Sequence, residues 1–309
     1  MTLDQLECFL AVARTGHFTR AASEVHLAQP SLSRQIAALE HDLGAQLFDR
    51  ARGNITLSPA GEALFPVATR MLDDADRARR AVADITGLRT GRLRLGATPS
   101  LCISVVADLL ERYHSSYPGI ELHVTENGSR ALVDKLARGE LDTALVIDGN
   151  NGRTASGLRL QQLYHEELVV VSASHRPPLT RSPALRLEQL AKHPMVVFDG
   201  NYDLRTTTDA AFKSAGLEQT VAVEGGELDA VLRFVERGIG AAVVPSTTVF
   251  TRPGLRAVRL KDPVLRRTVC LAHRSDVQPT RATIMLETLL EEVVGDLTAG
   301  EYQGVTRSR

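Results

Sequence analysis

The stretch from Phe18 to Leu57 constrains the fold of this chain more than any other part of the sequence. Its apolar residues recur with an i, i+4, i+7, i+11 spacing that places them on one face of a helix: Leu32, Ile36, Leu39 and Leu43. That face must pack against a core. The first turn of the same helix carries other residues that point away from the core: Pro30, Ser31, Ser33 and Arg34. Free backbone N–H groups and the helix dipole favour phosphate at such a helix start.

A shorter helix is predicted just before this one, over roughly Thr19 to Val25. Its Ala21-Ala22 pair allows another helix to approach closely, and a connection of a few residues, His26 to Ala28, separates the two helices. Two helices joined by a short turn are typical of a helix-turn-helix when the second carries small polar residues and an arginine on its outer face.

A two-stranded wing is predicted directly after the second helix. Leu47-Phe48 and Ile55–Leu57 are its apolar strands, and the residues between them include Arg50 and Arg52. We expect these two arginines at the wing to contact phosphate rather than base edges.

At these residues the chain resembles the LysR-type transcriptional regulators. One position departs from the family pattern: Ala28 stands where the family usually has a serine or threonine helix cap, and alanine cannot accept the capping hydrogen bond. The residues that carry the resemblance are Leu6, Phe9, Ala13, Phe18, Ala21, Ala22, Gln29, Pro30, Ser31, Ser33, Leu39, Glu40, Leu43, Gly44, Leu47, Phe48, Arg50, Leu57, Ala60 and Gly61.

The resemblance implies that the outer face of the second helix contacts DNA. The residues expected to do so are Gln29, Pro30, Ser31, Ser33 and Arg34. Arginine has the fork that pairs with guanine O6 and N7, and serine or glutamine can reach phosphate or base edges. The alternative is that Ser33 and Arg34 are ordinary exposed helix residues.

The composition limits which class of protein this can be, but it gives no sign of the helix-turn-helix. The 309 residues are enough for two or three domains, and the formal net charge of −1 gives no sign of a nucleic-acid partner. The first ten residues lack the cationic and apolar regions of a signal peptide, and no apolar run is long enough to cross a bilayer. Three cysteines far apart, Cys8, Cys102 and Cys270, fit a reducing cytosol. We therefore expect a cytoplasmic protein without a membrane partner.

A long helix is predicted to begin at Ser58-Pro59 and to run to about Leu88. One seam of it stays apolar for some six turns, through Leu64, Val67, Met71, Ala75, Ala78, Val82 and Ile85. A dimerising linker helix is the preferred interpretation, which the resemblance also implies. The alternative is a long surface helix packed on its own chain.

After the hinge Gly87–Gly91, strands alternate with helices, an order that indicates parallel sheets with covering helices. A weaker family pattern continues here through Leu136, Gly139, Leu141, Asp142, Val235, Gly238, Ile239, Gly240 and Pro245. It implies two α/β lobes whose fold is like that of periplasmic solute-binding proteins. The expected fold is therefore an all-α winged helix-turn-helix DNA-binding domain plus long linker helix, followed by an α/β two-lobed periplasmic-binding-protein-like effector domain.

The expected domains are the winged helix-turn-helix (1–58), the linker helix (59–89), the effector domain (90–300) and a flexible tail (301–309). Lobe I covers about 91–163 and 269–297, and lobe II about 164–268. The chain is expected to cross between the lobes near Gln161–Glu166 and Leu260–Thr268.

An effector site is expected between the lobes, because open α/β sheets bind ligands at the carboxyl ends of their strands. Hydroxyls and free N–H groups at such an end, where Thr98 to Leu101 turn into a helix, suit a small anion. By resemblance, Ser100 and Ser129 match positions that hold effector carboxylates in several relatives. The alternative is that Thr98 and Ser129 merely cap helices. The expected site residues are Thr98, Ser100, Leu101, Ser129, Phe198, Asp199 and Asn201.

None of the remaining motifs indicates a catalytic, cofactor or metal site. Gly238-Ile239-Gly240 leads into a strand and predicts a tight helix-to-strand turn rather than a dinucleotide loop, and His165-Glu166-Glu167 lacks the second histidine of a metal helix. By resemblance, some relatives that recognise diacids have an arginine after the position of Ile147. No arginine follows Ile147 here, so a dicarboxylate effector is not expected. Neither a metal, a cofactor nor a catalytic residue is assigned.

The sequence thus predicts a transcription regulator rather than an enzyme. Its expected partners are double-stranded DNA at a partly palindromic promoter site, a polar or anionic metabolite, and further copies of itself as a dimer or tetramer. RNA polymerase is left open as a partner, as is the choice between activator and repressor. The alternative interpretation is that the chain is a cytosolic small-molecule-binding protein or an enzyme with a solute-binding-protein-like fold.

Overall fold

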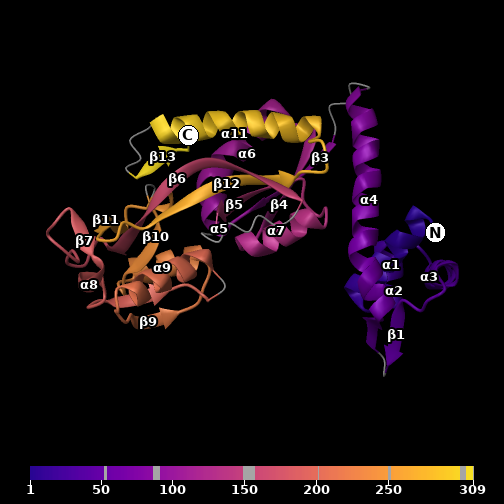
Figure 1. Ribbon diagram of the computed structural model, residues 1–309, viewed down its shortest axis with the longest axis horizontal. Coiled ribbons are helices and arrows are strands. Elements are labelled where there is room, and N and C mark those ends of the chain that lie inside the picture. Colours follow the sequence, from indigo (N-terminus) through magenta and orange to yellow (C-terminus); the bar gives the residue numbers. More distant parts are fainter. Residues whose placement is uncertain are drawn as a thin grey trace. The chain divides into compact units, whose positions relative to one another are not determined.

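Two compact units make up the chain (Figure 1). The N-terminal unit is built on Met1–Leu88, and the C-terminal unit on Arg89–Asp134 and Leu141–Arg309. The computed structural model describes residues 1–51, 54–85, 91–148, 157–200, 202–249, 252–299 and 304–308. The expected hinge at 87–90, the tip of the wing and Asn201 lie outside these residues.

Three helices form the core of the N-terminal unit: α1 (Leu3–Thr15), α2 (Phe18–Glu24) and α3 (Gln29–Leu43). The predicted apolar stripe of α3 is buried at Leu32, Ile36 and Leu39 but not at Leu43, which is 41% exposed. The stripe ends early because Gly44 terminates α3 in the left-handed conformation. Glu40 is buried instead, and its carboxylate accepts a hydrogen bond from the Leu47 N–H (2.8 Å) at the start of the wing.

The predicted wing is confirmed. Strands β1 (Phe48–Ala51) and β2 (Asn54–Leu57) pair antiparallel, with Phe48 opposite Leu57. The Phe48 ring packs on Phe9 with ring centroids 5.4 Å apart and on Phe18 at 6.2 Å. The wing is therefore anchored in the same core as the three helices.

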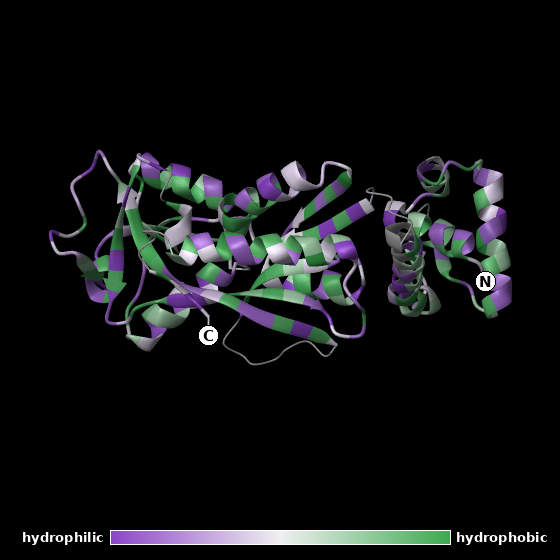
Figure 2. Ribbon diagram, turned by 90° about the horizontal axis from the view of Figure 1, so that it is seen from above, coloured by the Kyte–Doolittle hydropathy of each residue, from purple (hydrophilic) through white to green (hydrophobic). Residues whose placement is uncertain are grey.

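Helix α4 (Pro59–Ile85) is the predicted long helix (Figure 1). The Ser58 hydroxyl accepts the Gly61 N–H (3.1 Å) at its start, and Pro66 lies inside it without ending it. Ala68 is fully buried in the N-terminal core, with Leu64, Phe65, Met71 and Leu72 packed against it. Along the helices of both units, apolar and polar residues alternate (Figure 2).

Only part of the predicted seam of α4 is exposed. Val67 is 40% and Val82 63% exposed, whereas Leu64 and Met71 are partly buried against the core of the same unit. The first turns of α4 therefore belong to the N-terminal core by packing, whereas Ala78 and Val82 further along the helix are exposed.

Lobe I of the C-terminal unit has a mixed rather than a purely parallel sheet. Strand β3 lies between β4 and β5 and is parallel to both, but β12 is antiparallel to β5. The expectation of parallel sheets was therefore only partly right. The elements of this lobe are β3 (Gly91–Ala97), α5 (Pro99–Leu101), a π-helical turn (Cys102–Val106), α6 (Ala107–Ser116), β4 (Ile120–Glu126), α7 (Ser129–Ala137), β5 (Thr143–Asp148), β12 (Arg266–Arg274) and α11 (Arg281–Ala299).

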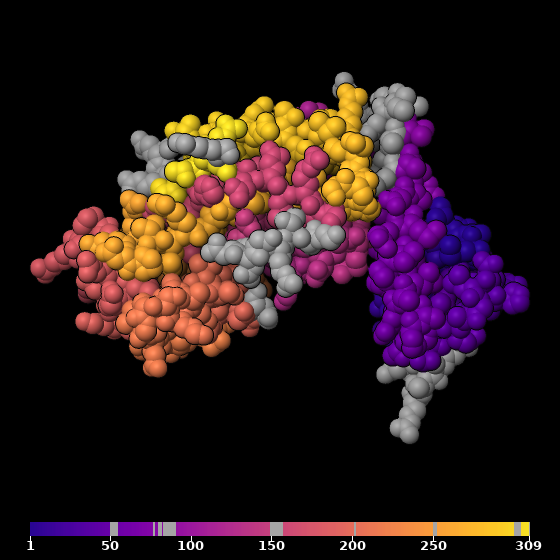
Figure 3. Space-filling view, in the orientation of Figure 1, coloured from indigo at the N-terminus to yellow at the C-terminus, as the bar shows by residue number. Residues whose placement is uncertain are grey.

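Helix α11 completes lobe I although it comes last in the chain. Its residues Leu286, Leu290 and Val293 are buried in one core with Leu93 and Leu95 of β3. Figure 3 shows the yellow residues of α11 along one side of the C-terminal unit. The chain must therefore return to lobe I after building lobe II, as the sequence predicts.

The two lobes share one long strand, β6 (Leu158–Ala173). Its first part pairs with β12, and its second part pairs with β10 (Ala242–Pro245) and β11 (Leu255–Lys261). The first crossing between the lobes thus lies inside a continuous strand, and the second lies between β11 and β12. β6 changes partner between Glu167 and Leu168, just beyond the expected region Gln161–Glu166, whereas the second crossing falls within the expected region Leu260–Thr268.

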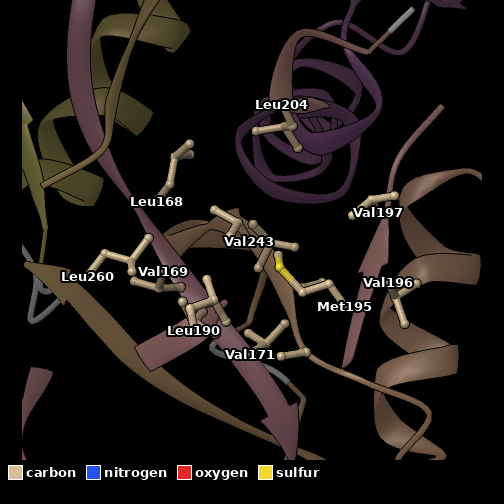
Figure 4. Close-up of a cluster of buried hydrophobic side chains, with 14 of the residues drawn as sticks. Leu168, Val169, Val171, Leu190, Met195, Val196, Val197, Leu204, Val243 and Leu260 are labelled. Atoms are coloured by element: carbon tan, nitrogen blue, oxygen red, sulfur yellow. The ribbon is translucent and has the colours of Figure 1, made fainter. Parts of the chain in front are cut away.

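Lobe II encloses its own core, drawn in Figure 4, in which Val169, Val171, Met195 and Val243 converge from three strands. The remaining elements of this lobe are β7 (Ala184–Arg186), α8 (Leu187–Leu190), β8 (Pro194–Val197), α9 (Asp203–Ser214), β9 (Thr220–Glu224), α10 (Leu228–Glu236) and a 3-10 turn (Ser246–Thr248).

The glycine motif of lobe II is the predicted helix-to-strand turn. Gly238 follows α10 with φ +77°, and a Cβ on Gly240 would lie 2.6 Å from the Pro194 carbonyl oxygen. Only glycine allows strands β8 and β10 to approach this closely.

Over its described residues the C-terminal tail forms a strand, where the sequence interpretation expected a flexible segment. Strand β13 (Val305–Arg307) pairs antiparallel with β6, and Val305 lies opposite Glu166. The Glu167 N–H also donates to the Gly304 carbonyl (2.8 Å). A short polar tail gives no periodic signal, so its pairing with β6 was not visible in the sequence.

Replacing Gly61 by alanine should destabilise the N-terminal unit. The added Cβ would clash with the Leu47 carbonyl oxygen and lie 2.9 Å from Leu57 Cδ2, so the start of α4 would have to move. We expect a loss of about 1–3 kcal/mol of unfolding free energy in urea titrations. Gly295→Ala in α11 is the matched control, because a Cβ there meets nothing within 4 Å, and it should stabilise the chain by about 0.5–1 kcal/mol. Equal effects of the two substitutions would contradict this packing.

Candidate functional site

The first turns of α3 present the residues predicted to contact DNA. Gln29, Pro30 and Arg34 are exposed, and Ser31 and Ser33 are half-buried. No side chain caps the helix at Ala28, as the sequence indicates. Pro30 has no backbone N–H, and the Ser31 N–H already donates to the Ala28 carbonyl (2.9 Å), so side chains rather than backbone donors dominate the surface that this helix start offers to an anionic partner.

Two hydrogen bonds order the side chains on this face. Gln29 Nε2 donates to Ser33 Oγ (3.0 Å), and Arg34 Nη2 donates to Ser31 Oγ (3.3 Å). Arginine has five N–H donors, so this single bond leaves the Arg34 guanidinium able to contact a base edge or a phosphate. Arg50 has its backbone paired with Ile55 in the wing, whereas its side chain and the whole of Arg52 lie outside the described residues.

A cleft of about 320 Å³, which includes space open to solvent, lies between the lobes of the C-terminal unit. Lobe I contributes the carboxyl ends of β3 and β5 and the start of α7, lobe II contributes the starts of α9 and α10, and β12 contributes an arginine. Its lining residues are Thr98, Pro99, Ser100, Gly128, Ile147, Tyr202, Asp203, Leu204, Leu228 and Arg267.

Thr98 and Ser100 line the cleft, as predicted. Both are buried, their hydroxyl oxygens are 3.4 Å apart, and Ser100 Oγ accepts a hydrogen bond from Arg267 Nη1 (2.8 Å). The Thr98 side chain makes no capping hydrogen bond, so the alternative that it merely caps a helix is wrong. The two hydroxyls together form a polar wall of the cleft.

Ser129 joins the two lobes. Its hydroxyl donates to Asp203 Oδ2 (2.6 Å) of lobe II and accepts the Ile147 N–H (3.0 Å) of lobe I. The hydroxyl is therefore engaged across the cleft and not as a helix cap. A hydrogen bond to a carboxylate is stronger than one between neutral groups, so it contributes to holding the lobes together.

An ion pair is buried at the base of the cleft. Arg267 Nε donates to Glu166 Oε1 (2.7 Å), and Thr247 Oγ1 of lobe II donates to Glu166 Oε2 (2.8 Å). Arg267 Nη2 lies 2.5 Å from Glu166 Oε1 but makes no hydrogen bond within the described part of the chain. Tyr164, whose hydroxyl is fully buried next to this pair, has its pKa raised well above the usual value by burial and by the Glu166 charge.

Four of the predicted effector residues that the structure describes are not among the residues lining the cleft: Leu101, Ser129, Phe198 and Asp199. Leu101 is fully buried in the core of lobe I, and Phe198 is buried in the core of lobe II, where it stacks on Tyr202 with ring centroids 5.3 Å apart. Asp199 is exposed, and Asn201 lies outside the described residues. The reason is that several residues separate β8 from α9, so the start of α9 reaches the cleft in place of the strand end.

The sequence interpretation missed Tyr202, Asp203 and Arg267. A cationic residue was sought after Ile147, close in sequence to the other lobe I positions. Arg267 instead comes from β12 and meets Ser100 across 167 positions of the chain. Only a prediction of which strands are neighbours would have found it.

The cysteine next to the cleft is not suited to redox chemistry. Burial, and then the nearby Glu126 carboxylate, raise the pKa of Cys102 to about 12. Burial likewise raises the pKa of Cys270 to about 12, and all three cysteines are free. The nucleophilic form of cysteine is the thiolate, so both groups are unreactive at neutral pH.

Two further searches of the described residues gave negative results. They contain no helix that is long and apolar enough to cross a membrane. Nor do they gather three or more histidine, cysteine or acidic side chains into a group that would hold a metal ion.

Comparison with protein families gives two matches that together cover most of the chain. Residues 3–62 match the family described as bacterial regulatory helix-turn-helix protein, lysR family, and residues 86–294 match the LysR substrate binding domain. The chain is 31% identical over 305 residues to the HTH-type transcriptional regulator IlvR of Caulobacter vibrioides, covering 97% of this chain and 99% of that protein. It is 32% identical over 250 residues to a probable nitrogen assimilation transcriptional activator of Synechococcus elongatus, covering 81% and 80% of the two chains.

Solved structures show the same fold. Full-length OxyR from Pseudomonas aeruginosa matches with a TM-score of 0.73 at 24% identity, covering 100% of this chain and 98% of that one. CbnR in complex with its target DNA matches with a TM-score of 0.69 at 24% identity, covering 96% and 99%. The winged helix-turn-helix followed by a two-lobed α/β domain is therefore confirmed.

Replacing Glu166 by glutamine should unfold the C-terminal unit readily, because the buried Arg267 charge would lose its partner. We expect a loss of about 3–5 kcal/mol in chemical unfolding of the full chain. Glu167→Gln is the control on the next residue. Its carboxylate is also buried, but its partners Arg259 and Arg266 are largely exposed and return to water when the pair is lost, so that change should cost less, about 1–2 kcal/mol. If the two variants unfold at the same denaturant concentration, the buried pair does not have the structural role assigned here.

Proposed function

The chain belongs to the LysR family of transcriptional regulators, and we propose that it senses its effector in the cleft between the lobes. Members of this family are DNA-binding regulators and not enzymes, and they bind small molecules in the two-lobed domain. The observation that carries the proposal is the juxtaposition of Thr98, Ser100 and Arg267 on one wall of a cavity of about 320 Å³. The effector is a polar or anionic metabolite that these donors bind.

DNA contact is assigned to the exposed face of α3. Gln29, Ser31, Ser33 and Arg34 reach the major groove from the first turns of α3, which begins at Gln29. Arg50 and Arg52 of the wing bind phosphate. Support comes from the exposure of Arg34 and from its hydrogen bond to Ser31, which orders its side chain near the helix start.

Helix α4 forms the dimer. Val67 and Val82 lie on the apolar seam of α4 and are 40% and 63% exposed, and covering them with the same seam of a second copy removes apolar area from water. Contacts between effector domains make a tetramer. The proposed domain bounds stay at 1–58, 59–89 and 90–300.

Regulation then follows from differential binding. An effector that binds one arrangement of the lobes more tightly shifts the population towards it, by no more than its difference in affinity for the two arrangements. The changed arrangement alters how paired winged helices sit on, and bend, a partly palindromic site. We place this event in the cytoplasm, with RNA polymerase as a further partner at the promoter.

Replacing Arg34 by alanine tests the DNA assignment. Loss of a bidentate contact to guanine should weaken specific binding by about 1–3 kcal/mol and relax the base preference at one position, in a fluorescence-anisotropy titration with DNA from upstream of the protein's own gene. Arg14→Ala removes the same charge from α1, where the arginine pairs with Glu24, and should leave specific affinity nearly unchanged. Unaltered specificity of Arg34→Ala would place the recognition surface elsewhere.

Replacing Val82 by aspartate tests the dimer. A carboxylate buried in the helix pair without a partner should weaken association by several kcal/mol, seen as slower sedimentation of the full chain. Arg70→Asp introduces the same group about 120° around the helix, on the basis of 3.6 residues per turn, and should not dissociate the dimer. A dimer that survives Val82→Asp would show that α4 is not its interface.

A further inference from the structure

The cleft has two chemically different ends. Lobe I and β12 contribute hydrogen-bond donors, namely the hydroxyls of Thr98 and Ser100 and the guanidinium of Arg267. Lobe II contributes acceptors at the starts of α9 and α10. The two sets face each other across the same cavity, so a ligand that fills it meets both.

The donor end contains one cation, Arg267, which is 7% exposed and paired with Glu166. Its Nε and Nη1 are hydrogen-bonded, and its Nη2 lies 2.5 Å from Glu166 Oε1 without the geometry of a hydrogen bond. Nη2 carries two N–H groups, so at least one of them can still donate to a ligand oxygen. Of the described residues that line the cleft, Arg267 is also the one cation.

The acceptor end contains one carboxylate that lines the cleft, Asp203, which accepts a hydrogen bond from Ser129 at Oδ2. Tyr202, which also lines the cleft, donates its hydroxyl to Glu227, so a second carboxylate lies one hydrogen bond behind this wall. A purely anionic ligand would be repelled here, whereas an ammonium group would be attracted.

The middle of the cleft is apolar. Ile147 of lobe I and Leu204 and Leu228 of lobe II line it between the two polar ends. The walls touch where Ser129 binds Asp203 (2.6 Å), so the lobes separate to admit a ligand, and these three side chains then face its aliphatic part.

We propose that the effector is a small zwitterion of the amino-acid class, with its carboxylate on Arg267, Thr98 and Ser100 and its ammonium group on Asp203. The proposal rests on the proposed function and narrows its polar or anionic metabolite to one chemical class. The ammonium group takes the place of the Ser129 hydroxyl at Asp203, so binding replaces a direct contact between the lobes by one that passes through the ligand.

Matched probes test the proposal on the full chain. L-alanine, L-valine and L-leucine are each compared with the 2-hydroxy acid and with the amine of the same carbon skeleton, at equal concentration. We expect at least one amino acid to raise the melting temperature by a few degrees, and its two analogues to leave it unchanged. Stabilisation by the hydroxy acids alone, by the amines alone or by none of the probes would overturn the proposal that the effector is a zwitterion.

Two variants locate the ends of the bound molecule. Asp203→Asn keeps an acceptor for Ser129 but removes the charge, and should weaken binding of the amino acid roughly 10–100-fold in calorimetry. Thr98→Val removes a hydroxyl and keeps the shape of the side chain, and it should weaken binding of the amino acid several-fold. Asp229→Asn removes a carboxylate of α10 that pairs with Arg252 outside the cleft, and should bind normally.

If Asp203→Asn and Asp229→Asn bind the amino acid with equal affinity, the ammonium group does not lie on Asp203. The proposed function fails on a different readout, the DNA titration of Arg34→Ala, so the two failures are distinguishable.

Discussion

The buried ion pair between Arg267 and Glu166 is the interaction on which the C-terminal unit depends. The two residues lie directly opposite each other on β12 and β6, the two strands that join the lobes. Arg267 binds Ser100 of lobe I, and Glu166 binds Thr247 of lobe II. Taking two charges out of water is unfavourable unless every partner is well placed, so this network fixes how the strands cross. The C-terminal strand β13 pairs with β6 at the same residue, Glu166.

The cleft is a consequence of that crossing. Because β6 is continuous through both lobes, the lobes share a base, and their facing walls meet at the ends of β3, β5, α9 and α10. The hydrogen bond from Ser129 to Asp203 then holds the walls together above the ion pair. Any ligand that binds Asp203 competes with this contact, which ties occupancy of the cleft to the arrangement of the lobes.

The N-terminal unit is stabilised by a hydrophobic core of its own. Its three helices and its wing share one core, and the first turns of α4 complete that core through Ala68 and its neighbours. The same helix turns a different face outward at Val82. One helix thus serves the DNA-binding core at its start and offers an apolar surface further along, because its apolar residues occupy more than one face.

The winged helix-turn-helix, the long helix, the two lobes and the position of the Thr98 and Ser100 hydroxyls at the cleft could all be predicted from the amino-acid sequence. These follow from helix periodicity, from residues such as Pro59 and Gly44 at helix ends, and from family motifs, all of which act over a few residues. Three outcomes became visible only in the folded chain: Leu101 and Phe198 belong to cores, the tail forms β13, and Arg267 and Asp203 line the same cleft. They depend on which strands are neighbours and on their register, between segments far apart in the sequence such as those of Ser100 and Arg267, and no local pattern specifies them.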